Sequence, residues 1–323
     1  MGLFARLTRR RNAGGGAPGL TIDPAHGDPE LTLLRERAAA GDWPGVRAVL
    51  DRALDQDDLA LMISHLADHT GSESWLGPAL EADPEDPVTL LAYGARHIHW
   101  GWEARTGARA QYVSEEQWRT FHERLEAGEE LLFKAAELDP ELLGPWLFLQ
   151  MSGRGASIDR AAARYRFDAA LRRSPGHPAS HRQRLQQLCE KWSGSHEQMH
   201  SFARASMLAA PEGSPLGELV ALAHIEHWLA LPSGEDASYM DRDPVRAQLH
   251  EAADRSIRHP DHLRRRNWPQ AHNTFALAFY LAGQPHAANL IFQEIGGAVC
   301  EDPWNYLGGD PVDTFRRIRA ACA

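Results

Sequence analysis

Residues 196–200 of this 323-residue chain read HEQMH and match the HExxH pattern of zinc sites. On a helix, this spacing places His196 and His200 one turn apart, where both can bind zinc, and Glu197 can activate a metal-bound water. A third protein ligand is required, and Glu218 in the next expected helix is a candidate. This interpretation predicts a zinc-dependent metallohydrolase.

The same five residues also have a structural interpretation. They directly follow Gly194-Ser195, and Ser195 with Gln198 has the spacing of a capping box, which satisfies the first N–H groups of a helix. The chain contains 17 histidines, so a chance match to the motif is not rare. We therefore expect His196 on a solvent-facing first turn and no stoichiometric zinc, with the metallohydrolase kept as an alternative.

A second group of candidate residues is the run His224-Ile225-Glu226-His227-Trp228. His224 and His227 are three residues apart and share one face of a helix. They could form a metal pair that supplies the third ligand, or, with Glu226, polar contacts to a ligand beside Trp228. They could equally be surface or hydrogen-bonded core histidines, and both interpretations stay open.

Further binding candidates combine aromatic and cationic side chains, the types that dominate binding hot spots. Tryptophan also fills gaps between packed helices, so a core role is the alternative for each Trp. Lysine occurs only twice in this arginine-rich chain, which makes Lys191 distinctive. The candidates are His97, Trp100, Trp102, Arg154, Lys191 and Trp192.

The elements that must position these residues follow from a repeat. Three similar helix endings, FKAAELDP, FDAALRRSP and FARASMLAAP, close on Pro140, Pro175 and Pro211. Successive prolines are 35 and 36 residues apart, and a fixed period in this range is the signature of helical repeats. The chain is therefore expected to be all-helical.

One repeat shows the pattern in detail. A first helix should end at residues 152–155, where two glycines allow the backbone to reverse. A second helix should begin at Ser157 or Asp159 and bury Ala163, Phe167 and Ala170, which lie three or four residues apart. The polar insertion at residues 232–243, further along the chain, reads as an exposed loop.

The order of Ala163, Phe167, Ala170 and Pro175 resembles the second helix of a tetratricopeptide repeat (TPR). The phrases KWSGS and HIEHW also resemble a bacterial, actinobacterial family of TPR-like proteins to which no activity is attached. The resemblance implies a right-handed α-α superhelix of about seven hairpins. The expected organisation is an Arg/Gly-rich disordered tail, a TPR-like helical repeat domain and a C-terminal cap, over residues 1–27, 28–300 and 301–323 respectively.

Composition narrows the functional classes. A net charge of −10 argues against nucleic-acid binding, which favours a basic face. Three cysteines without CxxC spacing predict reduced thiols in a cytoplasm, and no apolar stretch reaches the length of a membrane span. The tail carries four arginines between Arg6 and Arg11, which either contact an anionic membrane or partner or belong to a frayed terminus.

These observations favour a cytoplasmic module that binds a protein or peptide partner on the concave face of a helical solenoid, a scaffold-type function without a cofactor. The zinc metallohydrolase built on His196, Glu197 and His200 is one alternative. The other is a small-ligand-binding accessory or sensor protein that uses the region of Trp100, Trp192 and Trp228.

Overall fold

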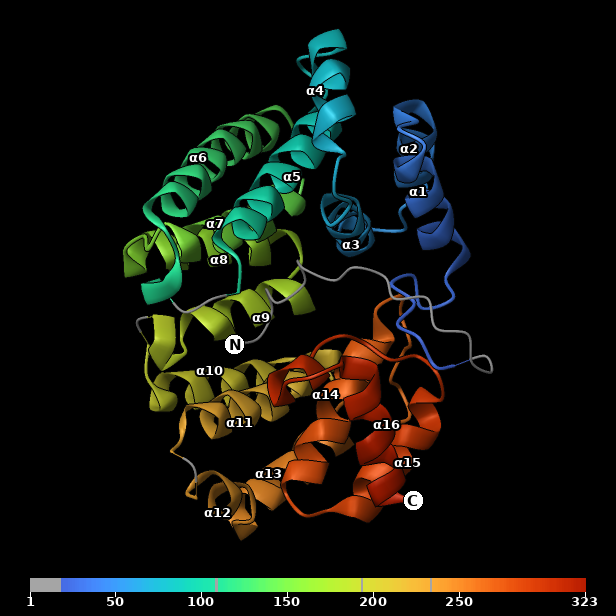
Figure 1. Ribbon diagram of the computed structural model, residues 1–323, viewed down its shortest axis with the longest axis vertical. Helices are drawn as coiled ribbons and strands as arrows, with labels where there is room; N and C mark the ends of the chain where they lie inside the picture. Colours follow the sequence, from blue (N-terminus) through green and yellow to red (C-terminus); the bar gives the residue numbers. More distant parts are fainter. Residues whose placement is uncertain (1–18, 108–109, 193, 233) are drawn as a thin grey trace. The chain divides into compact units, whose positions relative to one another are not determined.

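The computed structural model describes residues 19–107, 110–192, 194–232 and 234–323. All regular structure in these ranges is helical, without any β-strand, so the all-α prediction is confirmed (Figure 1). The described residues form two compact units: an N-terminal unit within residues 27–184, and a C-terminal unit that joins residues 19–26 with residues of the range 185–323. The predicted tail lies outside the described residues as far as residue 18.

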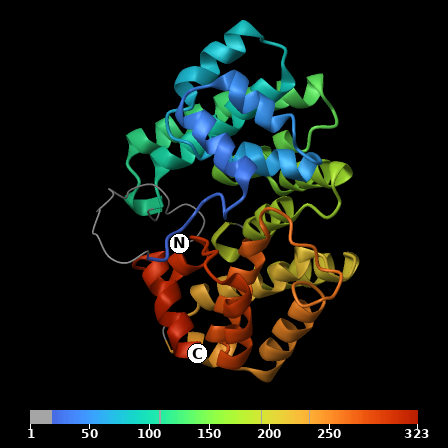
Figure 2. The same ribbon diagram turned by 90° about the vertical axis from the view of Figure 1, so that its right-hand side faces the viewer.

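The described residues of the N-terminal unit form eight helices that lie wholly within it, one short 3-10 helix and most of a ninth helix. They are α1 (Pro29–Ala39), α2 (Trp43–Leu50), α3 (Gln56–Ala67), α4 (Glu73–Ala82), α5 (Pro87–Arg105), η1 (Ala110–Tyr112), α6 (Glu115–Leu138), α7 (Gly144–Gly155), α8 (Arg160–Arg173) and α9 (Pro178–Gln187), which crosses the boundary between units. The long helices α5 and α6 pack side by side along much of their lengths (Figures 1 and 2).

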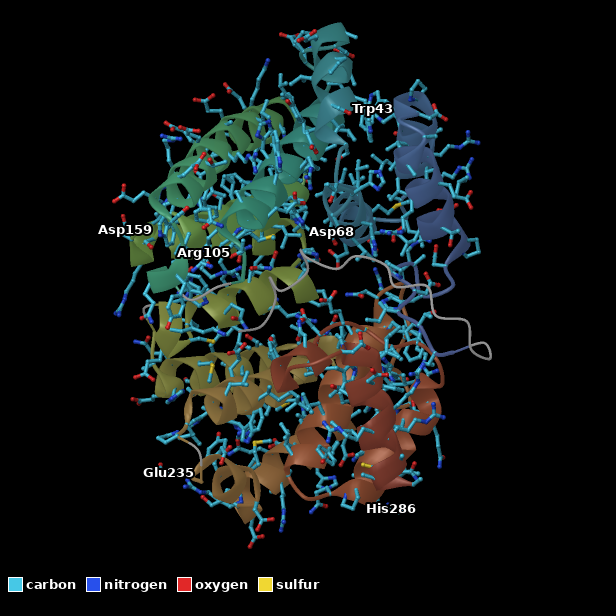
Figure 3. All side chains as sticks on the ribbon, viewed as in Figure 1. Trp43, Asp68, Arg105, Asp159, Glu235 and His286 are labelled. Carbon is cyan, nitrogen blue, oxygen red and sulfur yellow. The ribbon has the colours of Figure 1, made fainter. Side chains whose placement is uncertain are left out.

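Helix starts in this unit follow from local chemistry. Asp28, Asp86 and Asp159 precede α1, α5 and α8, and each carboxylate accepts hydrogen bonds from first-turn N–H groups. Asp159 lies at the edge of the unit in Figure 3. Helix α8 therefore begins where the sequence predicted. Ala163, Phe167 and Ala170 are all buried, as expected.

The turn before α8 differs from its prediction. Helix α7 continues to Gly155, and the chain reverses at residues 156–158 around Ser157, which has a φ of 54°. The reason is close packing: a Cβ on Gly155 would lie 2.5 Å from the Phe121 ring of α6. The glycine thus permits an approach between helices and does not make the turn.

The C-terminal unit contains the remaining elements. They are η2 (Glu190–Trp192), α10 (His196–Ala209), η3 (Pro215–Gly217), α11 (Glu218–Ala230), α12 (Asp236–Met240), α13 (Asp243–Asp254), α14 (Trp268–Leu281), α15 (Pro285–Ile295), η4 (Trp304–Leu307) and α16 (Pro311–Cys322). Helix α11 packs against α10, α13 and α14 and is buried on most sides, whereas η4 and α16 cover α15 at the C-terminal end (Figure 1).

The insertion at residues 232–243 is not the exposed loop that its polar composition suggested. It contains helix α12, and Tyr239 and Met240 at the end of that helix are buried in the core of the C-terminal unit. The polar residues at its start, including Glu235, remain exposed (Figure 3). Two apolar positions therefore anchor a segment that is otherwise solvated.

Candidate functional site

The two sequence phrases singled out in the C-terminal unit meet in space. Lys191 of η2 and Glu226 of α11, 35 positions apart, form an ion pair with 2.6 Å between Nζ and Oε2. The Glu226 side chain is 3% exposed, whereas Lys191 remains 37% exposed. A buried carboxylate is thus held by a lysine that still reaches solvent.

Glu226 has neutral donors in addition to the lysine. Gln186 Nε2 donates to Oε1 over 2.6 Å, and the Tyr306 hydroxyl donates to the same oxygen over 3.3 Å. Burial acts to raise the pKa of Glu226, but the Lys191 charge and the hydrogen bonds outweigh burial and lower that pKa below its ordinary value. Glu226 is therefore a fixed negative charge in the interior of the unit.

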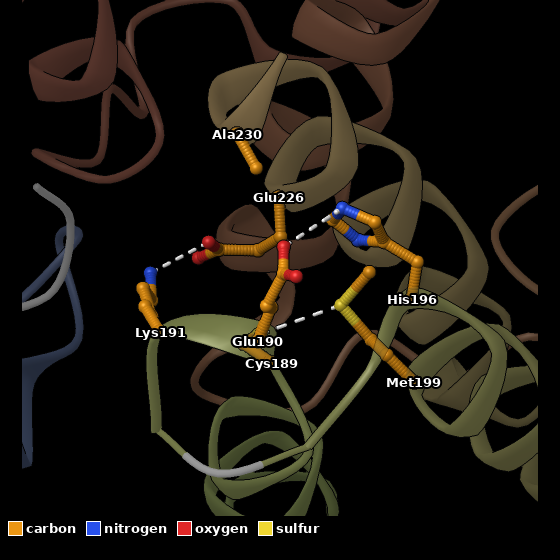
Figure 4. A pocket seen from close by; sticks show the side chains of 7 residues that line it. All are labelled: Cys189, Glu190, Lys191, His196, Met199, Glu226 and Ala230. Carbon is orange, nitrogen blue, oxygen red and sulfur yellow. Dashed lines mark hydrogen bonds and ion pairs between the residues drawn. The ribbon is translucent and has the colours of Figure 1, made fainter.

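A pocket of about 230 Å³ opens beside this ion pair (Figure 4). Lys191 and His196 approach from opposite sides, with Glu190 and Glu226 between them. Apolar and sulfur-containing side chains form the rest of the wall. The lining residues are Cys189, Glu190, Lys191, His196, Met199, Glu226 and Ala230.

The pocket walls differ in rigidity and charge. Cys189 Sγ and Met199 Sδ are 3.4 Å apart and both side chains are buried, so this wall is fixed by packing. Glu190 is 68% exposed, and one of its oxygens lies 3.4 Å from His196 Nε2. The pocket thus offers one exposed carboxylate, one buried carboxylate, one ammonium group and one imidazole.

His196 belongs to a network of four histidines and a tyrosine. The His196 ring stacks on His227, with 3.8 Å between centroids and 6° between planes. His200 Nε2 lies 3.0 Å from His227 Nδ1 and 3.2 Å from the Tyr239 hydroxyl. The Tyr239 hydroxyl is also 2.7 Å from His224 Nδ1. The network joins α10, α11 and α12.

The proton positions in this network follow from Gln248, whose Oε1 lies 3.0 Å from His224 Nε2 and can only accept. His224 Nε2 must therefore donate, so its Nδ1 accepts from Tyr239. The Tyr239 oxygen and His227 Nδ1 are then left to accept from His200 Nε2. His224 and His227 each accept a hydrogen bond through Nδ1 in this arrangement, so both rings are neutral.

The pKa values agree with neutral rings. Burial, then repulsion from neighbouring imidazoles, lowers the pKa of His200 to about 3. Burial lowers the pKa of His224 to about 4, and burial with nearby His196, His224 and Arg242 does the same for His227. Imidazoles with such values are weak bases, so the network is better suited to fixing geometry than to abstracting protons at neutral pH.

The HExxH segment forms the start of α10. Ser195 caps the helix by accepting from the Gln198 N–H, which is one of the two hydrogen bonds of the predicted capping box. His196 is not on a frayed, solvent-facing turn, because it stacks on His227. Glu218 accepts a hydrogen bond from Thr274 of α14 over 2.7 Å. Nowhere in the described chain do three His, Cys, Asp or Glu side chains assemble as metal ligands, so the geometry does not favour the zinc site.

Two of the remaining candidates, His97 and Trp100, are half-buried next to each other. In the N-terminal unit, His97 packs between Tyr93 and Trp100, and burial first, then Arg124 and Arg96, lowers its pKa to about 4. The Arg124 guanidinium lies 3.7 Å from the centroid of the half-buried Trp100.

Four further candidates help to build the cores of the units. Trp102 packs edge-on against Phe121, and Arg154 is buried with Nη1 donating to Gln183 over 2.5 Å, both in the N-terminal unit. Trp192 and Trp228 are partly buried against the core of the C-terminal unit. The aromatic character of the three tryptophans therefore indicates packing more than recognition.

Sequence reasoning missed the polar residues that complete the site. Tyr239 and Gln248 order the histidines, and Gln186 and Tyr306 support Glu226. Each lies in a different helix from its partner. Only Tyr239 carried a local signal, because it stands with Met240 as an apolar pair in a polar insertion.

Comparison with models of known protein families and with curated protein sequences finds no match to this chain. No helix of the described ranges combines the length and the apolar character needed to cross a membrane.

Proposed function

We propose that this chain is a binding protein for a protein or peptide partner, and that the pocket beside Lys191 and Glu226 receives a cationic side chain of that partner. The observation that carries the proposal is the charge of the pocket. Two carboxylates, Glu190 and Glu226, face one ammonium group, which leaves an excess of negative charge.

The size of the pocket supports a side chain as the occupant. Pockets for drug-sized molecules span roughly 300–1,000 Å³, and this pocket has about 230 Å³. A lysine or arginine side chain would place its aliphatic stem against Met199 and Ala230. Its cationic end would reach Glu190, whose carboxylate is exposed and can turn toward it.

The ion pair itself supports a binding role. Desolvating a carboxylate and an ammonium group costs free energy that their attraction only partly returns. Glu226 nonetheless sits at the base of a pocket with three donors fixed around it. A partner cation would gain from this preorganised negative charge without any rearrangement of the interior.

The proposal includes a TPR-like helical repeat arrangement and a cytoplasmic location. Consecutive helices that pack as neighbours, such as α7 with α8 and α14 with α15, support the repeat arrangement. The three cysteines, all described, are buried thiols without a disulfide, which supports a reducing compartment.

Selection from a random peptide library displayed on phage tests the proposal. The intact chain should enrich peptides that carry Lys or Arg flanked by apolar residues. Glu190→Gln should abolish that enrichment, because it removes the rim carboxylate. Glu197→Gln is the matched control, since Glu197 is exposed in the same segment but does not line the pocket. Failure to enrich cationic peptides, or enrichment of cationic peptides that survives Glu190→Gln, would refute the proposal.

A further inference from the structure

A strongly basic segment stands out in this acidic chain. Residues 154–184 contain eight arginines and two aspartates, with no lysine or glutamate, although the whole chain carries a net charge of −10. The segment includes α8, which packs on α7, and α7 in turn packs on α6. The positive charge is therefore concentrated on one part of the N-terminal unit.

Three aromatic rings lie together on these helices. The Trp146 ring meets Phe133 on one side and Tyr165 on the other, at centroid distances of 6.3 and 5.7 Å and edge-on at 80° in both cases. Phe133 is 43% exposed and Tyr165 is 57% exposed. Large aromatic rings at this exposure, supported from beneath by a buried tryptophan, are typical of recognition surfaces.

An arginine accompanies each ring. The Arg166 guanidinium lies 5.6 Å from the Phe133 centroid, Arg172 lies 5.8 Å from Tyr165, and Arg173 lies 5.2 Å from Trp146. Cation–π contacts at these distances hold the guanidinium groups near the rings and do not themselves use the N–H groups. We call these six residues the aromatic–arginine surface.

The arginines of this surface differ in whether they form an ion pair with a carboxylate. Arg166 is paired with Glu129 over 2.6 and 2.9 Å, and Arg164 on the same helix is paired with Asp168. Arg172 and Arg173 have no carboxylate within ion-pair distance among the described residues, and Arg173 donates only to its own helix, at the Ala169 carbonyl. Two adjacent guanidinium groups therefore lack a counter-charge.

The acidic groups near the surface do not neutralise these two arginines. Glu141 and Asp139 are the carboxylates whose charges reach Arg173, yet neither lies within 4.0 Å of it, and Asp139 accepts from the Glu141 N–H. Burial, followed by repulsion from Arg172, lowers the pKa of Arg173. An anionic ligand group would relieve that repulsion.

We propose that the aromatic–arginine surface binds an acidic segment of a partner protein, with carboxylates on Arg172 and Arg173 and an apolar or aromatic side chain against Phe133 and Tyr165. Planar guanidinium groups bind carboxylates in a bidentate manner, and exposed rings supply apolar contact area. A long nucleic acid is a poorer match, because the remainder of the chain is strongly acidic and repels a polyanion.

Fluorescence anisotropy on the intact chain tests this proposal with a labelled decapeptide of Asp, Glu, Leu and Phe. The peptide should bind, and its counterpart with Asn and Gln for the acids should bind at least about tenfold more weakly. Arg172→Ala and Tyr165→Ala should each weaken binding about tenfold. Both side chains are exposed, so both variants should keep the wild-type circular dichroism spectrum.

Arg119→Ala provides the matched control, because Arg119 is an exposed arginine of α6 outside the surface. It should bind the acidic peptide with wild-type affinity. A labelled oligouridylate of the same length should bind more weakly than the peptide. The proposal is overturned if the peptide does not bind, if Arg119→Ala weakens binding as much as Arg172→Ala, or if oligouridylate binds more tightly.

Discussion

The two units bury charge in opposite ways. The most deeply buried charged side chains of the N-terminal unit are the guanidinium groups of Arg96 and Arg154, whereas those of the C-terminal unit are the carboxylates of Glu218 and Glu226. Both units also bury imidazoles, such as His177 in the N-terminal unit and His224 in the C-terminal unit. An arginine is always charged and must be paired, but an imidazole can lose its proton and remain buried as a neutral group.

The two units also differ in whether a ligand could reach their buried ion pairs. Arg96 is 0% exposed and is held by Glu73, Glu103 and the Ala67 carbonyl, so no part of it can contact a ligand. Lys191 holds Glu226 from the solvent side and borders a pocket. We therefore expect Arg96 and its partners to stabilise the fold, whereas the proposed binding role concerns Lys191 and Glu226.

Among the variants considered, removal of the buried Arg96 guanidinium should reduce the free energy of unfolding most. Arg96→Met leaves Glu73 and Glu103 facing each other, each largely buried and without its cation. We expect a loss of about 3–5 kcal/mol in the free energy of unfolding of the N-terminal unit, measured by urea denaturation. Arg119→Met, at an exposed arginine, should change it by less than about 0.5 kcal/mol. A loss below about 1 kcal/mol for Arg96→Met would contradict the pairing argument.

The lysine of the pocket should have a smaller effect on stability. Lys191→Met leaves Glu226 buried with only neutral donors, but Lys191 is partly screened by solvent, so we expect a loss of about 2–3 kcal/mol. The chain's other lysine is the matched control. Lys134 is exposed and donates to the Pro84 carbonyl, so Lys134→Met should cost less than about 1 kcal/mol. Equal losses for the two variants would show that the ion pair adds nothing specific.

The histidine network should make the free energy of unfolding depend on pH. In the unfolded chain, histidines take up protons as the pH falls below about 6.5, while folded His200 stays neutral until about pH 3 and His224 and His227 until about pH 4. The unfolded state then binds more protons, so stability falls as the pH is lowered from 6.5 toward 4.

His200→Gln removes one of these groups and should reduce the acid-induced loss of stability by about 1–2 kcal/mol. Thermal unfolding recorded at pH 7.0, 5.5 and 4.5 measures this change. His286→Gln, at an exposed histidine of the same unit, is the control and should follow the wild type (Figure 3). If His200→Gln also has the wild-type pH profile, then His200 is not held neutral by the network.

Features within one helix, such as its buried face and its cap, were predictable from the sequence. Contacts between helices that are far apart in the sequence were not. The buried face of α8 and the Ser195 cap follow from spacings of three or four residues, which helix geometry fixes. The pairing of Lys191 with Glu226 and of His200 with Tyr239 depends on how separate helices pack, and no short-range pattern encodes that packing. Tyr239 was misplaced because glycine, serine and acidic neighbours dominate its segment.

The central claim is that the pocket beside Lys191 and Glu226 binds a cationic side chain, and methyl NMR tests it most directly. The chain has six methionines, of which Met199 lines the pocket and Met62 and Met151 belong to the N-terminal unit. Titrating Nα-acetyl-lysine methylamide into protein labelled with ¹³C-methyl methionine should move the Met199 signal saturably and leave Met62 and Met151 in place. The norleucine analogue, which lacks the ammonium group, should have little effect. An unchanged Met199 signal, or equal shifts with both compounds, would contradict the claim.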